Sequence, residues 1–105
     1  MVHVYGATID HQTRCKHYHT DVDIIAIKFK CCNKYYPCIH CHEEDETHPV
    51  EPWPSDTFEH TKAILCGVCQ HEMTIRSYMD HTHCPNCHAL FNSRCQFHYH
   101  HYFEI

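Results

Sequence analysis

Residues 66–87 read CGVCQHEMTIRSYMDHTHCPNC, and this stretch decides how the chain folds. It contains two CxxC motifs, Cys66–Cys69 and Cys84–Cys87, with fourteen residues between them. Each CxxC turn aims two sulfurs at one point, and four sulfurs make the tetrahedron that structural zinc takes. The gap is slightly shorter than the usual zinc-ribbon range, yet it leaves room for a hairpin or a short helix. The spacing therefore predicts a four-cysteine zinc site, with Gly67 expected to supply a left-handed residue in the first turn.

Two alternatives to zinc explain the motifs less well. Ten cysteines could form disulfides in a secreted protein, but Met1 to Asp10 show no basic segment followed by a long apolar run, so no signal peptide is predicted. A thioredoxin-type redox site needs one CxxC that opens a helix, not two motifs that face each other. Paired CxxC motifs interleaved with histidine favour metal binding.

The composition indicates that apolar packing alone cannot hold the fold. The 105 residues include 10 Cys and 15 His, while Ile, Leu, Val and Phe together number 20. This share lies near the limit of about 20% below which chains tend to be disordered. Small domains with so little apolar surface use disulfides or metals as cross-links. We therefore predict one metal-stabilised unit over residues 1–105, with sub-units 1–48 and 58–105.

Alternation of apolar and polar residues predicts the first strands. Asp23–Lys30 places Ile25, Ile27 and Phe29 on one face of a strand, and Lys34–Tyr36 continues it as a hairpin. The other expected elements are short strands at 2–5 and 61–65, a helix at 41–46, an element of undecided type at 73–79 and a helix at about 94–102. Three prolines mark 47–57 as a linker between the two halves.

The first half of the chain holds eight more candidate metal ligands, enough for two closed sites: Cys15, His17, Cys31, Cys32, Cys38, Cys41, His42 and His48. Adjacent residues of an extended segment point to opposite sides, so Cys41 and His42 are assigned to different zinc ions. The preferred partition gives one ion to Cys15, His17, Cys38 and Cys41, and the other to Cys31, Cys32, His42 and His48. The same alternation would separate Cys31 from Cys32 unless a tight turn brings both to one metal.

These motifs resemble the CHY-type zinc finger. The resemblance rests on four segments: Cys15-Lys-His17-Tyr18, Phe29-Lys-Cys31-Cys32, Tyr35-Tyr36-Pro-Cys38-Ile-His-Cys41-His42 and the later His48. It covers roughly residues 13–98 and implies about three zinc ions, held with little regular secondary structure. The paired CxxC motifs carry the third ion in that family.

The tail, from Phe91 to Phe103, is similar to stand-alone members of the family. These include a mitochondrial intermembrane-space helper that assists zinc removal and oxidation of small Tim chaperones. The same finger also precedes the RING domain of certain ubiquitin ligases, but no RING is recognised in this chain, so ligase activity is not implied. Cys95, His98 and His101 are candidates for a further metal or for packing against the third site.

The expected function is zinc binding without catalysis. Thiolate-rich sites dampen the Lewis acidity that a hydrolytic zinc needs, and no HExxH motif is present. The structural zinc ions would present a surface to an unidentified protein partner; the alternative is a factor that handles zinc or thiols for client proteins. A formal net charge of −5 and only 8 scattered Lys and Arg argue against nucleic acid. A monomer without a membrane span is expected, in the cytoplasm because free thiolates persist in a reducing compartment.

Overall fold

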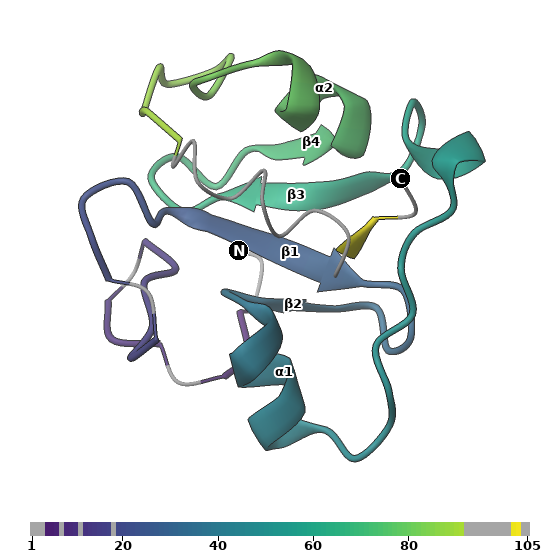
Figure 1. Ribbon diagram of the computed structural model, residues 1–105. Coiled ribbons are helices and arrows are strands. Elements are labelled where there is room, and N and C mark those ends of the chain that lie inside the picture. The colour runs from purple at the N-terminus through teal and green to yellow at the C-terminus, as the bar shows by residue number, and fades with distance from the viewer. Residues whose placement is uncertain (1–3, 7, 11, 18, 92–101, 104–105) are drawn as a thin grey trace.

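The computed structural model describes residues 4–6, 8–10, 12–17, 19–91 and 102–103 of the chain. Four antiparallel strands form one sheet in the order β2-β1-β3-β4, and two short helices accompany it (Figure 1). The elements are β1 (Ile25–Phe29), β2 (Lys34–Tyr36), α1 (Ile39–Asp45), the 3-10 turn η1 (Ser55–Thr57), β3 (Lys62–Cys66), β4 (Glu72–Thr74) and α2 (Ile75–Asp80). The expected small α+β fold with little regular secondary structure is confirmed.

The centre of the sheet joins the two halves of the chain. Strand β1 comes from the first half and β3 from the second, and they pair antiparallel with Ile25 opposite Cys66 and Ile27 opposite Ile64. The two expected sub-units therefore meet side by side within one sheet. Figure 1 shows α1 beside β2 at one edge and α2 beside β4 at the other, so the two halves place their helices at opposite edges.

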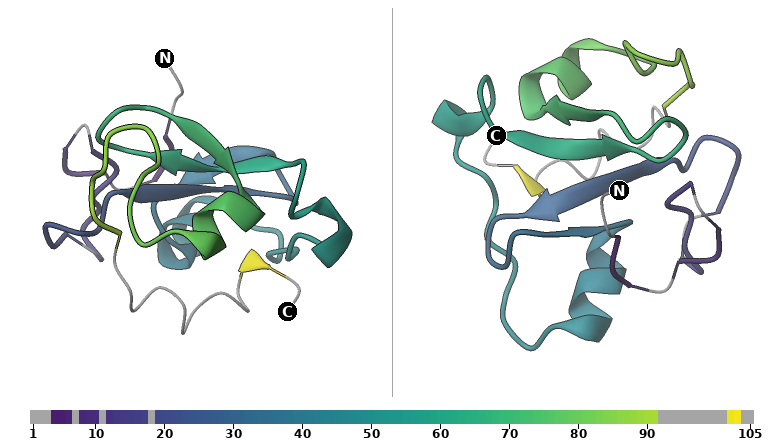
Figure 2. Two further views of the ribbon diagram at one scale, coloured as in Figure 1. Left: turned by 90° about the horizontal axis from the view of Figure 1, so that it is seen from above. Right: turned by 180° about the vertical axis from the view of Figure 1, so that it is seen from behind.

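Strand β1 places Ile25, Ile27 and Phe29 on one face, as the sequence predicts, and the structure adds a small second core on the other face. Ile25, Ile27 and Phe29 face the main core, which also receives side chains of both helices and of the chain end. Ala26 faces the opposite side, where it packs with Tyr35 and other residues of a much smaller cluster. In the left view of Figure 2 both α-helices and residues 102–103 lie on one side of the sheet. The main core is therefore the side on which the helices cover the sheet.

The segment of undecided type, 73–79, is half strand and half helix. Strand β4 ends at Thr74, whose hydroxyl accepts a hydrogen bond of 3.1 Å from the backbone N–H of Ser77. This is the N-cap arrangement that starts a helix, and α2 begins at the next residue, Ile75. The expected helix at 94–102 and the candidate ligands Cys95, His98 and His101 lie outside the described residues.

The proline-rich linker packs against the sheet. The indole N–H of Trp53 donates a 2.6 Å hydrogen bond to the backbone oxygen of Lys28 on β1, and its backbone N–H donates to Tyr102. Through Trp53 the linker thus connects Tyr102 to strand β1.

Of the expected strand at 2–5, Val4 forms an isolated parallel bridge with Tyr35.

Candidate metal centres

The four cysteines of the CxxC motifs converge on one point, here called site 3. The Sγ atoms of Cys66 and Cys87 are 3.7 Å apart, and those of Cys69 and Cys84 are also 3.7 Å apart. A tetrahedron with each sulfur about 2.3 Å from zinc has edges of about 3.8 Å. A disulfide would instead bring two sulfurs to about 2.05 Å. The spacing therefore fits a metal ion between four thiolates.

The two CxxC turns have the same backbone design. In the first, the N–H of Gln70 donates to the oxygen of Cys66 at 2.8 Å; in the second, the N–H of His88 donates to the oxygen of Cys84 at 2.9 Å. Both Gln70 and His88 adopt left-handed backbone conformations, with φ of 66° and 65°. Each turn is thus closed by a left-handed residue directly after its second cysteine.

The left-handed role expected for Gly67 is wrong. Gly6, not Gly67, is the glycine with positive φ among the described residues. Gly67 is needed because the backbone of Gln12 passes directly above it: a Cβ on Gly67 would lie 2.2 Å from the oxygen of Gln12. This contact joins the loop at Gln12 to the first CxxC turn, and the spacing of residues around Gly67 does not predict it.

We expect His88→Gly to stabilise the zinc-loaded chain by about 1 kcal/mol, because the left-handed conformation is unfavourable for residues with a Cβ. The side chain of His88 is exposed, so little packing is lost. Thermal unfolding in the presence of zinc measures the gain. His88→Ala is the control, since it removes the imidazole but keeps the Cβ; a gain of equal size in this variant would contradict the explanation.

Site 1 consists of Cys15, His17, Cys38 and Cys41. The Sγ atoms of Cys15 and Cys38 are 3.8 Å apart, and His17 Nδ1 lies 3.5 Å from Cys38 Sγ and 3.4 Å from Cys41 Sγ. Cys38 directly precedes α1 and Cys41 lies within it, while Cys15 and His17 come from the N-terminal loop. All three cysteines are buried. The site therefore clamps the N-terminal loop onto α1.

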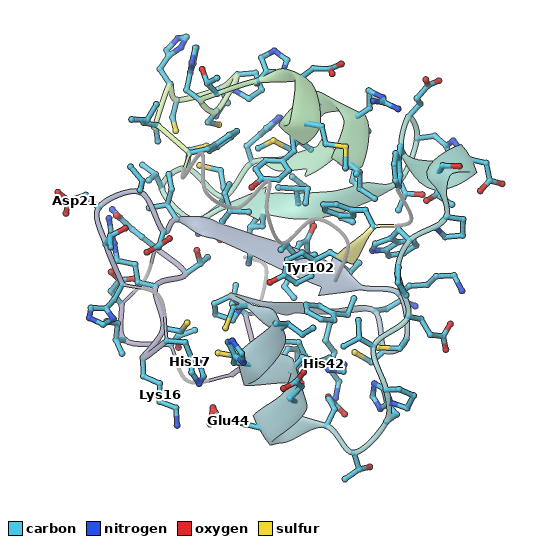
Figure 3. All side chains as sticks on the ribbon, in the orientation of Figure 1. Lys16, His17, Asp21, His42, Glu44 and Tyr102 are labelled. Atoms are coloured by element: carbon cyan, nitrogen blue, oxygen red, sulfur yellow. The ribbon has the colours of Figure 1, made fainter. Side chains whose placement is uncertain are left out.

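A carboxylate outside the cluster fixes the ring of His17. Glu44 Oε1 lies 2.8 Å from His17 Nε2, and the other carboxylate oxygen pairs with Lys16 Nζ at 2.9 Å (Figure 3). The hydrogen bond from Lys16 lowers the pKa of Glu44, which stays ionised. Such a carboxylate sets the tautomer that turns the other ring nitrogen toward a metal. The sequence interpretation missed Glu44, although its place three residues after Cys41 on a helix puts both on one face.

We expect Glu44→Ala to weaken zinc binding at site 1 by about 10- to 100-fold, the usual loss when an outer hydrogen-bond partner of a ligating histidine is removed. Chelator competition against the purified chain measures the affinity of each bound equivalent. Glu43→Ala is the matched control, because Glu43 is an exposed acidic neighbour on α1. Equal weakening in both variants would show that acidic charge alone, and not the hydrogen bond to His17, supports the site.

Site 2 consists of Cys31, Cys32, His42 and His48. His42 Nε2 lies 3.2 Å from both Cys31 Sγ and His48 Nε2, and the two sulfurs are 3.9 Å apart. The vicinal cysteines reach one point because a tight turn joins β1 to β2: Asn33, with φ of 55°, donates to the oxygen of Phe29 at 2.7 Å. The open question of the Cys31–Cys32 pair is thereby answered by the turn.

The structure also separates Cys41 from His42, but for a different reason than the one expected. Both residues lie on α1, not on an extended segment. Successive side chains of a helix differ by about 100° in direction, so Cys41 faces site 1 while His42 faces site 2. The His42 ring stacks on Phe29 with ring centroids 4.5 Å apart. Burial, followed by the neighbouring His48, lowers the pKa of His42, which favours the neutral form that binds metals.

The close packing of cysteine side chains disfavours their thiolate forms unless a cation lies between them. The hydrogen-bonded Cys15 thiol, together with burial, raises the pKa of Cys38, and burial raises the pKa of Cys66 to about 12. Burial acts in the same direction on Cys69, but hydrogen bonds from the Asn86 side chain and the His71 backbone lower its pKa to about 7. A divalent cation overcomes such penalties, because a coordinating thiol is deprotonated outright. The three clusters, with four sulfur or imidazole ligands each, can thus bind three zinc ions as cross-links.

Fold and sites together define a small α+β protein organised around three zinc sites, two of them interleaved in sequence. A family model for the CHY zinc finger matches residues 15–92, and the chain belongs to that family. It is 48% identical over 104 residues to Helper of Tim protein 13 of Saccharomyces cerevisiae, covering 96% of this chain and 90% of that protein. Helper of Tim protein 13 of Kluyveromyces lactis is 43% identical over 100 residues, covering 95% and 87%. An uncharacterised protein of Schizosaccharomyces pombe is 41% identical over 101 residues, covering 96% and 88%.

These relatives contradict the cytoplasmic location expected from the sequence, because two of them are named as helpers of Tim proteins. The expectation depended on free thiolates requiring a reducing compartment. Zinc binding protects thiolates from oxidation, so zinc-bound cysteines do not require a reducing compartment. The helices in the described part of the chain are too short to span a bilayer; α1, the longer of the two, has seven residues.

Proposed function

We propose that this chain is a non-catalytic factor that exchanges zinc with cysteine-rich client proteins of the Tim type in the mitochondrial intermembrane space. The observation that carries the proposal is the likeness to two proteins named Helper of Tim protein 13 along almost the whole chain, 96% of it in the first case. A helper of cysteine-rich clients needs a way to accept or return their metal, and the three clusters of this chain offer one.

The geometry supports a role without catalysis. Each cluster offers four protein ligand atoms, all within 4.8 Å of one another. A catalytic zinc keeps three protein ligands and leaves the fourth position for water or substrate. Four ligands that include two to four thiolates also reduce the charge that a zinc-bound water would need for activation. The chain therefore acts on clients by binding and exchange.

A second candidate function is a pure interaction module. Its support comes from α1, where Glu43, Glu44 and Asp45 are exposed and give the helix that carries Cys41 and His42 an acidic surface. The net charge of −5 adds to the attraction for a basic partner. Such a module would bind its partner while all of its zinc ions stay in place. Zinc exchange therefore separates the two functions.

Isotope exchange tests the proposal. The chain is loaded with zinc-67 and mixed with a reduced small Tim chaperone loaded with natural zinc, and the two proteins are separated after five minutes. We expect about one zinc per chain to have mixed between the proteins. A dialysis membrane between them is the control, and slower mixing across it would indicate transfer by direct contact. A stable complex in which neither protein changes its isotope would contradict zinc handling and support the interaction module.

A further inference from the structure

We propose that site 2 is the exchangeable zinc position of this chain, and that His48 is the ligand that leaves first. Sites 1 and 3 then keep their ions and hold the fold while site 2 opens. The inference rests on the proposed zinc-handling function and names the cluster through which it acts. Four features of the three clusters support it.

The first feature is the donor set. Site 3 offers four thiolates and site 1 offers three, whereas site 2 offers two thiolates and two neutral imidazoles. Against the two positive charges of zinc, the formal charge of the filled site is −2 for site 3, −1 for site 1 and zero for site 2. A neutral imidazole attracts the cation less than a thiolate does, so site 2 has the weakest electrostatic hold.

The second feature is access. In site 2, Cys31, Cys32 and His48 are all partly exposed, and only His42 is buried. In site 1 the three cysteines are buried and His17 is the one partly exposed ligand. The side chain of His48 is 35% exposed, against 21% for His17. Site 3 has two partly exposed ligands, Cys69 and Cys87, so site 2 offers an incoming ligand the largest number of accessible positions, and His48 is one of them.

The third feature is that neither imidazole of site 2 has a close outer hydrogen-bond partner among the described residues. His17 is held by Glu44 at 2.8 Å, whereas His48 Nδ1 lies 3.8 Å from Glu46 Oε1, beyond hydrogen-bond distance. The carboxylate of Glu46 is engaged elsewhere, since its other oxygen accepts from Lys34 at 2.8 Å and from Tyr36 at 2.6 Å. His42 Nδ1 is buried and has no hydrogen-bond partner among the described residues. Outer partners of this kind are worth about 10- to 100-fold in metal affinity.

The fourth feature is where His48 sits in the chain. Helix α1 ends at Asp45, and His48 follows in an irregular segment just before Pro49. The other three ligands of site 2 are fixed by the β1–β2 turn and by α1. When the neutral imidazole of His48 leaves, a cysteine of the client takes its place as a thiolate; the thiol proton passes to the released imidazole or to water, and no electron moves. The departure exposes one coordination position and leaves the fold in place.

Chelator kinetics test the inference without any client. The full chain, loaded with three zinc ions, is mixed with an excess of 4-(2-pyridylazo)resorcinol, and zinc release is followed by absorbance. We expect one equivalent to leave at least tenfold faster than the other two. Far-UV circular dichroism recorded after the fast phase should still match the loaded protein. Release of all three equivalents in one phase would overturn the inference.

Two variants that keep four ligands assign the fast phase. His48→Cys converts site 2 to three thiolates and one imidazole, and we expect it to slow the fast phase at least tenfold. Cys87→His makes the reverse change at site 3, from four thiolates to three thiolates and one imidazole, and it should leave the fast phase unchanged. The assignment would be overturned if the rate of the fast phase were unchanged in His48→Cys, or if it changed in Cys87→His. His48→Ala should load only two tightly held equivalents.

The two proposals can fail independently. A fast phase located at site 1 or site 3 would contradict the role of site 2 but leave zinc handling intact. A fast phase at site 2 combined with no isotope exchange with the client would contradict zinc handling, while the lability of site 2 would stand. His48→Cys therefore belongs in both experiments: it should slow chelator release and client exchange to a similar degree if both proposals hold.

Discussion

We expect complete removal of zinc to unfold this chain. A structural zinc site contributes about 10 kcal/mol or more of apparent folding free energy, and whole domains are stable by only about 5–15 kcal/mol. The three clusters include nine of the cysteines and bring together the N-terminal loop, the β1–β2 turn, α1 and both CxxC turns. We expect a tight chelator to abolish the dispersed amide signals of the protein in a two-dimensional NMR spectrum, and added zinc to restore them.

The order of loss is part of the same expectation. Removal of the first equivalent should disturb mainly signals around the β1–β2 turn and the end of α1, because site 2 connects them. Removal of the remaining equivalents should collapse the spectrum. Magnesium in place of added zinc is the control for restoration, since it prefers oxygen ligands and should not refold the chain. A dispersed spectrum that survives full chelation would contradict the account.

We expect Gly67→Ala, which adds one methyl group, to destabilise the zinc-loaded chain strongly. The added Cβ would lie 2.2 Å from the backbone oxygen of Gln12 and 2.4 Å from its carbonyl carbon, and backbone atoms cannot rotate away. The backbone N–H of Gly67 also donates to Ile24 at 2.6 Å, which prevents the turn from moving back. Overpacking costs about 1–3 kcal/mol, and contact with fixed backbone places this variant at the upper end.

The loop at Gln12 leads directly to Cys15, so the damage should spread from site 3 to site 1. We expect Gly67→Ala to lower the unfolding midpoint of the zinc-loaded chain and to weaken zinc binding at both sites in chelator competition. Val68→Ala is the control, because Val68 is the neighbouring residue and is 43% exposed. An unchanged midpoint for Gly67→Ala, or equal losses in the two variants, would show that the close approach has no energetic role.

Local sequence patterns were sufficient for the metal ligands and for the strongest strand. Cysteine and histidine are the residue types that bind zinc, and their spacing indicates which of them share a site. The sequence therefore predicted the three groups of ligands that the structure brings together. Alternation identified β1 because Ile25, Ile27 and Phe29 face the main core while the opposite face carries lysine, with Lys28 only partly buried. Threonine is among the residues preferred at N-caps, but Thr74 and Ile75 are both β-branched and also fit a strand, so the sequence left the helix start undecided.

Contacts between distant residues could not be predicted in this way. Glu44 supports His17 across twenty-seven positions of sequence, and Gly67 is required by Gln12. Helical spacing places Glu44 on the face of Cys41, but only the fold brings His17 of the N-terminal loop within reach of its carboxylate. The location of the protein was misjudged for a related reason: zinc protects thiolates from oxidation, and the presence of reduced cysteine does not report the compartment.

Native mass spectrometry of the purified chain tests most directly the claim that metal clusters hold the fold in place of a large apolar core. We expect a folded charge-state distribution with three bound zinc ions, and under denaturing conditions a mass with the cysteines of the three sites reduced. A folded chain that carries no metal and shows the mass deficit of cystine pairs would contradict it.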